Sequence, residues 1–363
     1  MKKNKNYVDL KDQPVPEGQH LLEVDDLKMY FHTEDGVVRA VDGVSYTLDR
    51  GETLGVVGES GSGKSVTAMT IMGLISMPPG KIEGGDVRYR GRSILEMTEE
   101  EMQHIRGNDI AMIFQDPMTS LNPVYKIGKQ VGEGLRLHRG YSKQEALKRA
   151  TELLDLVGIP EPEKRVNEYP HQFSGGMRQR VMIAMALACD PDILIADEPT
   201  TALDVTIQAQ IIELMQEMQE KNGNAIIMIT HDLGVVADMA DKIMVMYAGR
   251  PVEFGTAEEI FYESRHPYTW GLIRSIPEQA IEEKKPLTPI HGNPPSLMNL
   301  PEGCVFSPRC PYATDKCRKQ RPERVVTESG HYSACHYSGD PEFLKNAPET
   351  SRTRKDFKNG GEA

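Results

Sequence analysis

The chain has 363 residues, of which 39% are hydrophobic and 26% are charged. This length is enough for two domains at about 150 residues each, and the composition is that of an ordinary globular protein. A net charge of −12 argues against a general nucleic-acid-binding protein, which needs a basic surface. The longest apolar run, residues 181–189, is far shorter than the roughly 20 residues of a membrane-spanning helix. No apolar stretch follows the basic start, so no signal peptide is expected.

The first part of the chain predicts an antiparallel sheet. Residues 1–20 are polar and contain two prolines, so we expect a flexible N-terminal arm. Residues 21–31 and 37–48 have the pattern of two strands, joined by a turn at 34–36. Residues 81–92 predict a further hairpin at the edge of this sheet.

A phosphate-binding loop is predicted directly after the apolar strand 53–57. Its sequence is Gly58-Glu59-Ser60-Gly61-Ser62-Gly63-Lys64-Ser65, and a helix is expected over 66–75, which is the usual context of the G-x-x-x-x-G-K-[S/T] pattern. Glycines let successive N–H groups converge on phosphate oxygens, and the helix N-terminus favours the same anion. Lys64 supplies a charge for the β- and γ-phosphates, and the Ser65 hydroxyl can ligate Mg²⁺. A chance match in a Gly/Ser-rich turn is the alternative, but the flanking strand and helix favour a nucleotide site.

The middle of the chain predicts an α/β core with a helical insertion. Residues from about 115 to 169 have a helical pattern, in which Ser142 and Glu145 form a capping box. Uniformly apolar strands, covered on both faces and separated by helices, are then expected at 193–196, 225–229 and 243–247.

Polar side chains follow three of the predicted buried strands. Asp197 can hold Mg²⁺, and Glu198 can polarise the water that attacks the γ-phosphate. Gln115 can contact Mg²⁺ or that water, and His231 stands at the carboxyl edge of the sheet, where open α/β folds bind ligands. A pair of acids after a strand, a loop Gln or a lone His is often structural, so these assignments depend on the phosphate loop.

A second anion-binding helix start is predicted at Ser174-Gly175-Gly176, which leads straight into the apolar helix 181–189. A plain N-cap is the alternative interpretation of these three residues.

From about residue 256 the chain changes character. Prolines recur too densely for a long helix, so we expect a loop-rich domain over 256–340 and a polar tail over 341–363. The domain holds four cysteines, and without a secretion signal a metal site explains them better than disulfides do. Zinc and an iron–sulfur cluster both suit four thiolates; the spacing lacks the C-x₂-C pairs of many zinc sites, while His331 and His336 keep zinc open. The four are Cys304, Cys310, Cys317 and Cys335.

In their order and spacing, these motifs resemble those of the ATP-binding cassette (ABC) ATPases. The resemblance covers about residues 21–255 and includes the 58–65 loop, Gln115, residues 174–176, Asp197-Glu198, the turn at 202–204 and His231. It implies an α/β P-loop NTPase cassette with an antiparallel β subdomain and a helical subdomain at about 115–180. The family's signature usually ends in Gln, and Met177 stands there in this chain.

The same resemblance implies how nucleotide is bound. Two cassettes pair head to tail, and each ATP touches the phosphate loop of one subunit and Ser174, Gly175 and Gly176 of the other. An aromatic residue, Phe31 or alternatively Tyr30, stacks on adenine. The other positions expected to bind nucleotide are Ser60, Gly61, Ser62, Gly63, Lys64, Ser65, Thr67, Gln115 and Asp197. Mg²⁺ is expected on Ser65, Gln115 and Asp197, and the catalytic residues are Glu198, His231 and Gln115.

Three segments are similar to the ATPase subunits of dipeptide, oligopeptide and nickel importers: residues 115–123, 266–269 and 303–311. The implied protein hydrolyses ATP at the cytoplasmic face of the membrane and powers peptide import. Its implied partners are a related second cassette, two transmembrane permease subunits and an extracytoplasmic substrate-binding protein, and no nucleic acid. In that group, the four cysteines hold a 4Fe–4S cluster.

Two other functions stay open at this point. One is an importer ATPase for nickel or another small solute. The other is a soluble cassette ATPase of translation or DNA repair, which would need a second cassette, a long coiled coil or a basic surface. The sequence has one cassette and a net negative charge, so the importer is the stronger interpretation.

Overall fold

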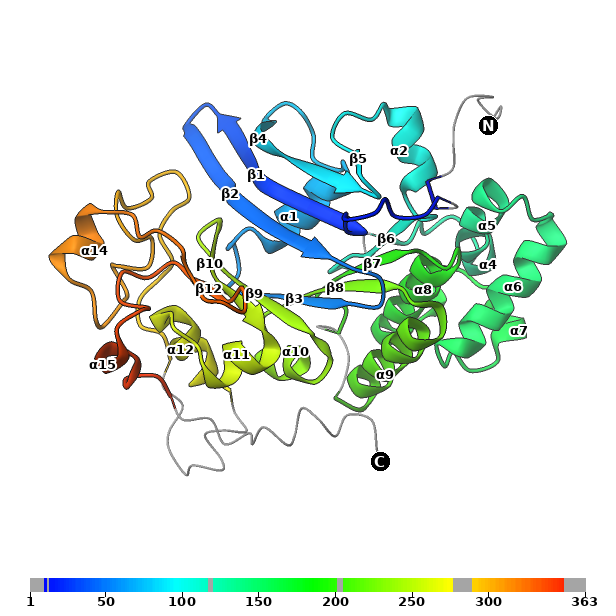
Figure 1. Ribbon diagram of the computed structural model, residues 1–363. Coiled ribbons are helices and arrows are strands. Elements are labelled where there is room, and N and C mark those ends of the chain that lie inside the picture. The colour runs from blue at the N-terminus through cyan, green and yellow to red at the C-terminus, as the bar shows by residue number, and fades with distance from the viewer. Residues whose placement is uncertain (1–9, 12, 117–119, 201–204, 277–288, 349–363) are drawn as a thin grey trace. The chain divides into compact units, whose positions relative to one another are not determined.

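The computed structural model describes residues 10–348 except 12, 117–119, 201–204 and 277–288. The chain forms two compact units, and each is built from several chain segments. Unit 1 contains residues 1–23, 47–52 and 88–227, and unit 2 contains residues 24–46, 53–87 and 228–363. Figure 1 labels the helices and strands of both units.

Unit 2 contains the buried strand that leads into the predicted phosphate loop. β3 (Thr53–Val57) is buried at every position, as expected for a strand covered on both faces. It runs parallel to β9 (Lys242–Tyr247), with Leu54 opposite Lys242. The strand order in this unit is β11-β12-β10-β9-β3, and the next strand, β8, has residues in both units. The remaining strands of this series are β8 (Ala225–Thr230), β10 (Arg250–Thr256), β11 (Val325–Val326) and β12 (Tyr332–Ser333).

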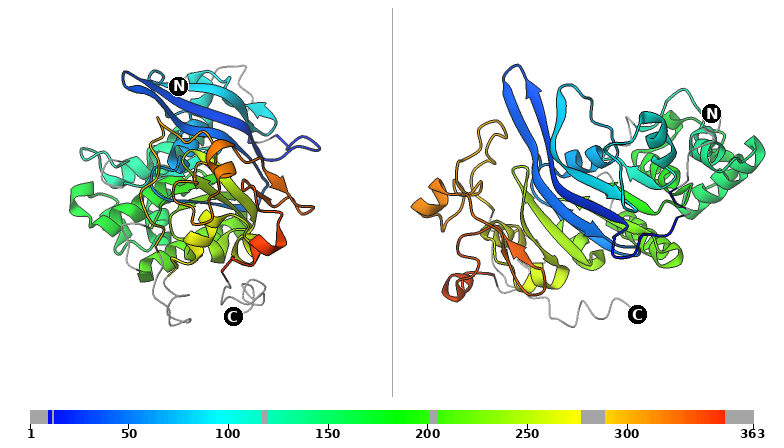
Figure 2. Two further views of the ribbon diagram at one scale, coloured as in Figure 1. Left: turned by 90° about the vertical axis from the view of Figure 1, so that its left-hand side faces the viewer. Right: turned by 45° about the horizontal axis from the view of Figure 1, so that its top comes forward.

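The predicted hairpins of the N-terminal sheet are confirmed. β1 (Leu22–Thr33) and β2 (Gly36–Leu48) are long strands with only Glu34 and Asp35 between them (Figure 2). In unit 2 the neighbours are β2, β1 and β4 (Gly80–Tyr89), in this order. The end of β4 lies in unit 1, where it pairs antiparallel with β5 (Arg92–Ser93).

Unit 1 contains two buried parallel strands and a helical region. β6 (Ile110–Ile113) pairs with β7 (Ile193–Asp197), so that Ile110 lies opposite Ile193. The predicted helical insertion is present, and α8 packs on α4, α6 and β6 (Figure 1). The helices of this helical region are α4 (Ile127–Val131), α5 (Glu133–His138), α6 (Lys143–Leu156), α7 (Pro162–Arg165), the 3-10 helix η1 (Pro170–Gln172) and α8 (Gly175–Leu187).

The capping box predicted at the start of α6 is confirmed. The Ser142 hydroxyl accepts from the N–H of Glu145 at 3.3 Å, and the Ser142 N–H donates to the Glu145 carboxylate at 2.8 Å. The remaining helices are α1 (Lys64–Ile71), α2 (Glu99–Ile105), α9 (Val205–Asn222), α10 (Leu233–Met239), α11 (Ala257–Tyr262), α12 (Pro267–Ile273), α14 (Asp315–Lys319) and α15 (Pro341–Leu344). Within the described part of the chain, none of the helices is long and apolar enough to cross a bilayer.

Two residues in the described part of the N-terminal arm contact the rest of unit 1. The Leu10 side chain is buried, and the Lys11 ammonium donates to the Asn108 and Cys189 carbonyl groups at 3.0 and 3.1 Å. Residues 16–19 are exposed. The flexibility of the arm over residues 1–20 stays a prediction.

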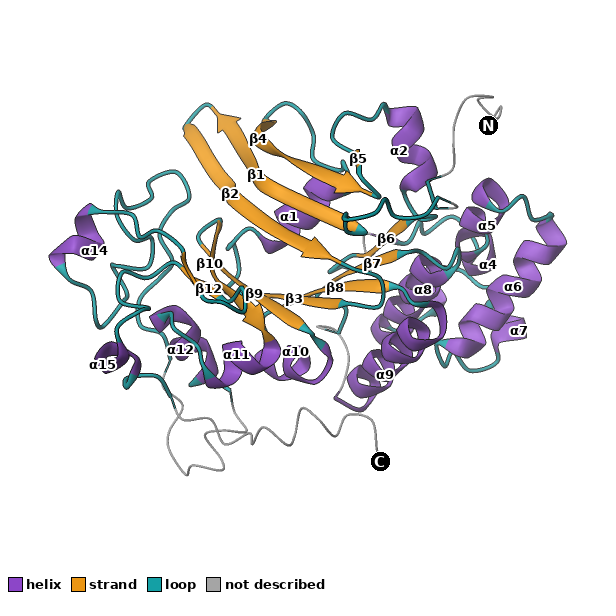
Figure 3. Ribbon diagram, in the orientation of Figure 1, coloured by secondary structure: helices purple, strands orange, loops and turns teal. Residues whose placement is uncertain are grey.

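The C-terminal segment of unit 2 is rich in loops, as predicted, and its helices are short (Figure 3). The polar tail predicted over 341–363 begins with the short helix α15. The Phe343 ring on α15 lies 5.3 Å from the Trp270 ring and 5.5 Å from the Tyr312 ring. One aromatic residue thus anchors the start of a segment that is otherwise polar.

A buried ion pair supports the start of β7, which carries the predicted acidic residues. Asp192 accepts from Tyr89 Oη at 2.6 Å and from Arg90 Nε at 3.1 Å, and Arg50 approaches it at 3.1 Å. The side chains of Arg90 and Asp192 are 2% and 3% exposed. Arg90 and Asp192 therefore form a buried ion pair in unit 1.

Replacing Asp192 by alanine is expected to lower the free energy of unfolding by about 3–5 kcal/mol, because it leaves the Arg90 guanidinium buried without its carboxylate. Urea denaturation of the full chain measures this change. Asp315→Ala removes an exposed pair with Arg318 and is the matched control, with little expected effect. Equal stability of the two variants would contradict the structural role of Asp192.

Candidate functional site

The loop after β3 has the backbone that a phosphate site requires. Gly58 and Gly63 have φ values of 152° and 100°, which side chains disfavour. A Cβ atom at Gly58 would lie 2.2 Å from the Met246 carbonyl oxygen, and one at Gly63 would lie 2.3 Å from the Ala40 carbonyl oxygen. Glycine is therefore required at both positions. The loop leads directly into α1, which has no acidic residue in its first turn, so the helix N-terminus stays favourable for an anion.

Two side chains of this loop, Ser62 and Lys64, are buried. The Lys64 ammonium is 5% exposed and donates to the carbonyl oxygens of Gly58 and Glu59 at 2.7 and 3.1 Å. Ser62 Oγ is buried and has no hydrogen-bond partner within the described chain. Thr67 Oγ1 donates to the Gly63 carbonyl at 2.9 Å, so this hydroxyl also braces the helix start. A buried cation and an unpartnered hydroxyl beside a backbone cradle are suited to phosphate oxygens.

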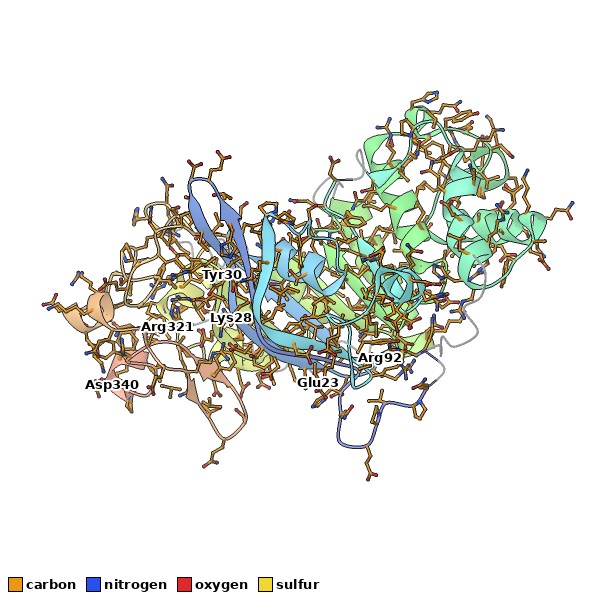
Figure 4. The ribbon with its side chains drawn as sticks, turned by 90° about the horizontal axis from the view of Figure 1, so that it is seen from above. Glu23, Lys28, Tyr30, Arg92, Arg321 and Asp340 are labelled. Atoms are coloured by element: carbon orange, nitrogen blue, oxygen red, sulfur yellow. The ribbon has the colours of Figure 1, made fainter. Side chains whose placement is uncertain are left out.

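The two aromatic candidates lie side by side in β1 but have different surroundings. Tyr30 Oη donates to Asp42 at 2.9 Å, and Arg250 Nε donates to the same carboxylate at 2.8 Å. Burial, followed by the hydrogen bond to Asp42, raises the pKa of Tyr30. Arg321 approaches Asp42 at 3.9 Å, and Figure 4 labels Tyr30 on β1 and Arg321 in the C-terminal segment. Phe31 is half-buried. Adenine stacking by either ring stays a prediction.

The structure brings Gln115 and Glu198 together in unit 1. Gln115 follows β6, Glu198 follows β7, and Gln115 Nε2 donates to Glu198 Oε2 at 2.9 Å. Asp197, the last residue of β7, is 2% exposed. Glu198 has a φ of 48°, a left-handed conformation that is uncommon outside glycine and is often found at functional sites. Parallel strands therefore bring an amide and a carboxylate into hydrogen-bond contact.

Ser174 is the N-cap of α8, as predicted, and its hydroxyl accepts from the Met177 N–H at 3.3 Å. Ser174 and Gly175 are exposed, and Gly176 is half-buried. Gln179, which lies about one turn further along α8, was not predicted from the sequence. It is 1% exposed, and its Nε2 donates to the Pro199 carbonyl at 2.6 Å, next to Glu198. Because Gln179 lies between Arg178 and Arg180, the local sequence carries no signal that singles it out.

His231 follows β8, which lies beside β3 in unit 2, and its side chain is exposed. Asp232, its neighbour, caps α10 by accepting from the Gly234 N–H at 2.8 Å. The turn expected at 202–204 lies outside the described residues. The phosphate loop and His231 thus belong to unit 2, whereas Gln115, Ser174, Asp197 and Glu198 belong to unit 1.

The prediction of a 4Fe–4S cluster, with zinc as its alternative, is wrong. Cys304, Cys310, Cys317 and Cys335 line one small pocket as free thiols. Across the residues that the structure describes, no group of three or more His, Cys, Asp or Glu side chains is placed to hold a metal ion.

The thiols are partly or fully buried, and the two histidines that kept zinc open have other hydrogen-bond partners. Burial raises the pKa of Cys310 to about 11 and that of Cys335 to about 12. His331 contacts Glu253 at 3.1 Å, and His336 contacts the Gln320 carbonyl at 2.9 Å. Cysteine spacing alone could not reveal this burial.

Comparison with known proteins places the chain in a family. The ABC transporter model matches residues 41–201, and the model of the oligopeptide/dipeptide transporter C-terminal region matches residues 252–317. The chain is 58% identical over 312 residues to the oligopeptide transport ATP-binding protein OppD of Bacillus subtilis, which covers 86% of this chain and 87% of that protein. It is 52% identical over 320 residues to the dipeptide transport ATP-binding protein DppD of Escherichia coli, covering 88% and 97%.

Solved structures confirm the predicted cassette fold. The dimeric post-hydrolysis state of the ATP-binding cassette MJ0796, bound to ADP and Pi, is 29% identical with a TM-score of 0.60 and covers 65% of this chain and 98% of that one. These similarities extend over both the cassette and the C-terminal segment of the sequence. The chain therefore belongs to the ABC transporter ATP-binding proteins, in the group that carries the oligopeptide/dipeptide transporter C-terminal region.

Proposed function

We propose that this protein is the ATP-hydrolysing subunit of a transporter that imports oligopeptides or dipeptides. The observation that carries the proposal is that one chain joins an ABC cassette to the C-terminal region of the oligopeptide/dipeptide transporters. Its relatives are named as oligopeptide and dipeptide transport ATP-binding proteins. A substrate-binding protein and the permease select the peptide, and this chain supplies the energy of ATP hydrolysis.

The proposed domains follow the sequence motifs. The nucleotide-binding cassette spans residues 21–255, with its helical subdomain at about 115–180. The cysteine-bearing C-terminal domain spans residues 256–340. The assembled transporter holds the chain at the cytoplasmic face of the membrane through its permease subunits.

The phosphates of ATP are assigned to the loop 58–65. Support comes from the two positions that exclude a side chain, from the buried Lys64 ammonium and from the unpartnered Ser62 hydroxyl. Ser60, Gly61 and Thr67 complete the contacts, and Phe31 or Tyr30 stacks on adenine. Ser65, Gln115 and Asp197 are the residues that hold Mg²⁺, which when bound neutralises charge on the β- and γ-phosphates.

Glu198 is assigned as the base that accepts a proton from the attacking water. Its hydrogen bond with Gln115 supports this role, because the amide orients the carboxylate. The Gln179 bond to the Pro199 carbonyl holds the backbone next to Glu198. His231 is assigned to orient the water or to donate a hydrogen bond to the γ-phosphate.

A second cassette completes the proposed site. Ser174 and Gly175 are exposed at the N-terminus of α8, where they are available to the ATP of another subunit. Gly176 is assigned to the same contact. A related cassette chain is the proposed partner, and the dimeric cassette structure bound to ADP and Pi supports such pairing.

A groove in the helical region is the proposed docking site for the permease. Its volume is about 750 Å³, and Val124, Tyr125 and Leu147 are apolar lining residues that are 71%, 44% and 39% exposed. The charged residues that line it are all basic: Lys126, Lys129, Arg136 and Lys143. This combination suits a short amphipathic helix with an apolar face and acidic side chains, as a cytoplasmic segment of a permease would supply.

Leu147→Asp is expected to lower the amount of permease that copurifies with the chain by about ten-fold or more, because it places a charge on the apolar part of the groove. Detergent solubilisation, affinity purification and mass spectrometry of the intact complex measure this. Leu156→Asp is the matched control, since Leu156 is also exposed on α6 but does not line the groove. Normal recovery of permease with Leu147→Asp would reject this docking site. Recovery of ribosomes or DNA in place of a permease with the unchanged chain would reject the transport function.

A further inference from the structure

Glu59 in the phosphate loop is bound by the C-terminal segment of unit 2. Arg309 Nη1 and Nη2 donate to the two carboxylate oxygens of Glu59 at 2.5 and 3.0 Å, which is a bidentate ion pair. The Arg309 side chain is only 4% exposed, whereas Glu59 is 30% exposed. The pair joins residues 250 positions apart in the chain. It is therefore partly shielded from water, unlike the surface ion pairs that contribute little.

The backbone of Glu59 is held by a second residue of the same segment. The Glu59 N–H donates to the hydroxyl of Tyr268, at the start of α12, at 2.8 Å. The Glu59 carbonyl accepts from the Lys64 ammonium at 3.1 Å. Glu59 thus has its side chain, its N–H and its carbonyl fixed, and the last of these contacts is to the cation assigned to the phosphates.

Arg309 is itself anchored on its remaining donors. Its Nε donates to the His291 carbonyl at 2.9 Å, and Nη2 also donates to the Ile290 carbonyl at 3.1 Å. Nη1 further donates to Tyr247 Oη at 3.3 Å. Every N–H-bearing nitrogen of the guanidinium therefore has a partner, so its fork cannot turn without breaking several bonds.

Aromatic packing makes this anchor rigid. The Tyr247 ring lies 4.6 Å from the Tyr268 ring and 5.2 Å from the Phe306 ring, and all three side chains are 2% exposed or less. Phe306 belongs to the turn that ends in Arg309 and Cys310, because its carbonyl accepts from the N–H groups of both residues at 3.0 Å. Through Phe306, the turn that carries Arg309 thus belongs to the same aromatic cluster as Tyr268, whose hydroxyl binds the loop.

We propose that Arg309 and Tyr268 are positioning residues that hold the phosphate loop in its nucleotide-binding conformation. This makes the C-terminal segment part of the ATP site. A loop fixed before the ligand arrives loses less conformational entropy on binding, so the expected contribution is to nucleotide affinity rather than to the chemical step. The inference rests on the assignment of residues 58–65 to the phosphates of ATP.

Arg309→Met and Glu59→Gln in the full chain, assembled with its transporter partners, are each expected to raise KM for MgATP about ten-fold and to change kcat less than about two-fold. Tyr268→Phe keeps the ring and removes the acceptor hydroxyl, so it is expected to raise KM about three-fold. The charge-swapped variant Glu59→Arg with Arg309→Glu is expected to lower KM below that of both single variants. Arg318→Gln, an exposed arginine in the same segment, is the control and should leave KM unchanged.

Binding of a fluorescent ATP analogue to the purified full chain separates the possible failures. If Lys64→Ala lowers binding but the Arg309, Glu59 and Tyr268 variants bind as the unchanged chain does, the positioning role is rejected and the loop assignment stands. If Lys64→Ala also binds normally, the loop assignment itself is rejected. Should Arg309→Met fail to fold, Arg309→Lys decides, since it keeps the charge without the bidentate fork. An unchanged KM in that variant, or a swapped pair no better than the singles, would overturn the proposal.

Discussion

Lys64→Ala is expected to reduce ATP hydrolysis by about 10²- to 10³-fold or more, to the background of the assay. The Lys64 ammonium is 5% exposed and already held by two loop carbonyl groups, so its charge is placed before nucleotide binds. In such a water-poor site, the attraction between one cation and the phosphate charges is stronger than it would be in bulk water. Alanine removes the charge together with its hydrogen bonds to the Gly58 and Glu59 carbonyl groups, and it keeps the glycines that shape the loop.

Phosphate release by the assembled transporter measures this loss, and binding of a fluorescent ATP analogue measures how much arises from affinity. Lys81→Ala is the matched control, because that lysine lies in the same unit, on β4, with a side chain that is 62% exposed. Thermal denaturation of both variants shows whether the fold is kept. A folded Lys64→Ala protein that hydrolyses ATP at the normal rate would refute the assignment of the 58–65 loop.

Local chemistry explains which parts of the fold could be predicted. β3, β6 and β7 are almost uniformly apolar, and each is fully buried, so burial on both faces could be inferred from composition alone. The capping box of Ser142 and Glu145 and the Ser174 N-cap depend on residues three positions apart, and they form as expected. The order of the motifs in the chain was enough to identify the cassette family.

Contacts between residues that lie far apart along the chain could not be predicted from the sequence. Arg309 meets Glu59 across 250 positions, and neither residue belongs to a pattern that would pair them. Gln179 was hidden for the same reason, since its partner is a backbone carbonyl 20 positions away. The cysteines show the converse error: their clustering in the sequence suggested a metal site, but whether side chains are placed to hold an ion depends on the fold, which spacing does not encode.

Glu198→Gln is expected to slow ATP hydrolysis by about 10²- to 10⁴-fold while ATP binding is kept. The amide has nearly the shape of the carboxylate and can still bond with Gln115, which lies 2.9 Å from Glu198 Oε2. It cannot accept a proton from water at neutral pH. If Glu198 is the water-activating base, the variant therefore binds ATP and pairs with a second cassette, but it hydrolyses the bound ATP only slowly.

Two measurements on the same Glu198→Gln protein distinguish this state from simple damage. Single-turnover phosphate release should fall, and size-exclusion chromatography with ATP should show more paired cassettes than the unchanged chain does. Glu213→Gln, an exposed glutamate on α9, is the control and should change neither. Glu198 itself has a φ of 48°, an uncommon backbone conformation of the kind often found at functional sites. Normal turnover by Glu198→Gln would move the catalytic base to another residue, with His231 the next to test.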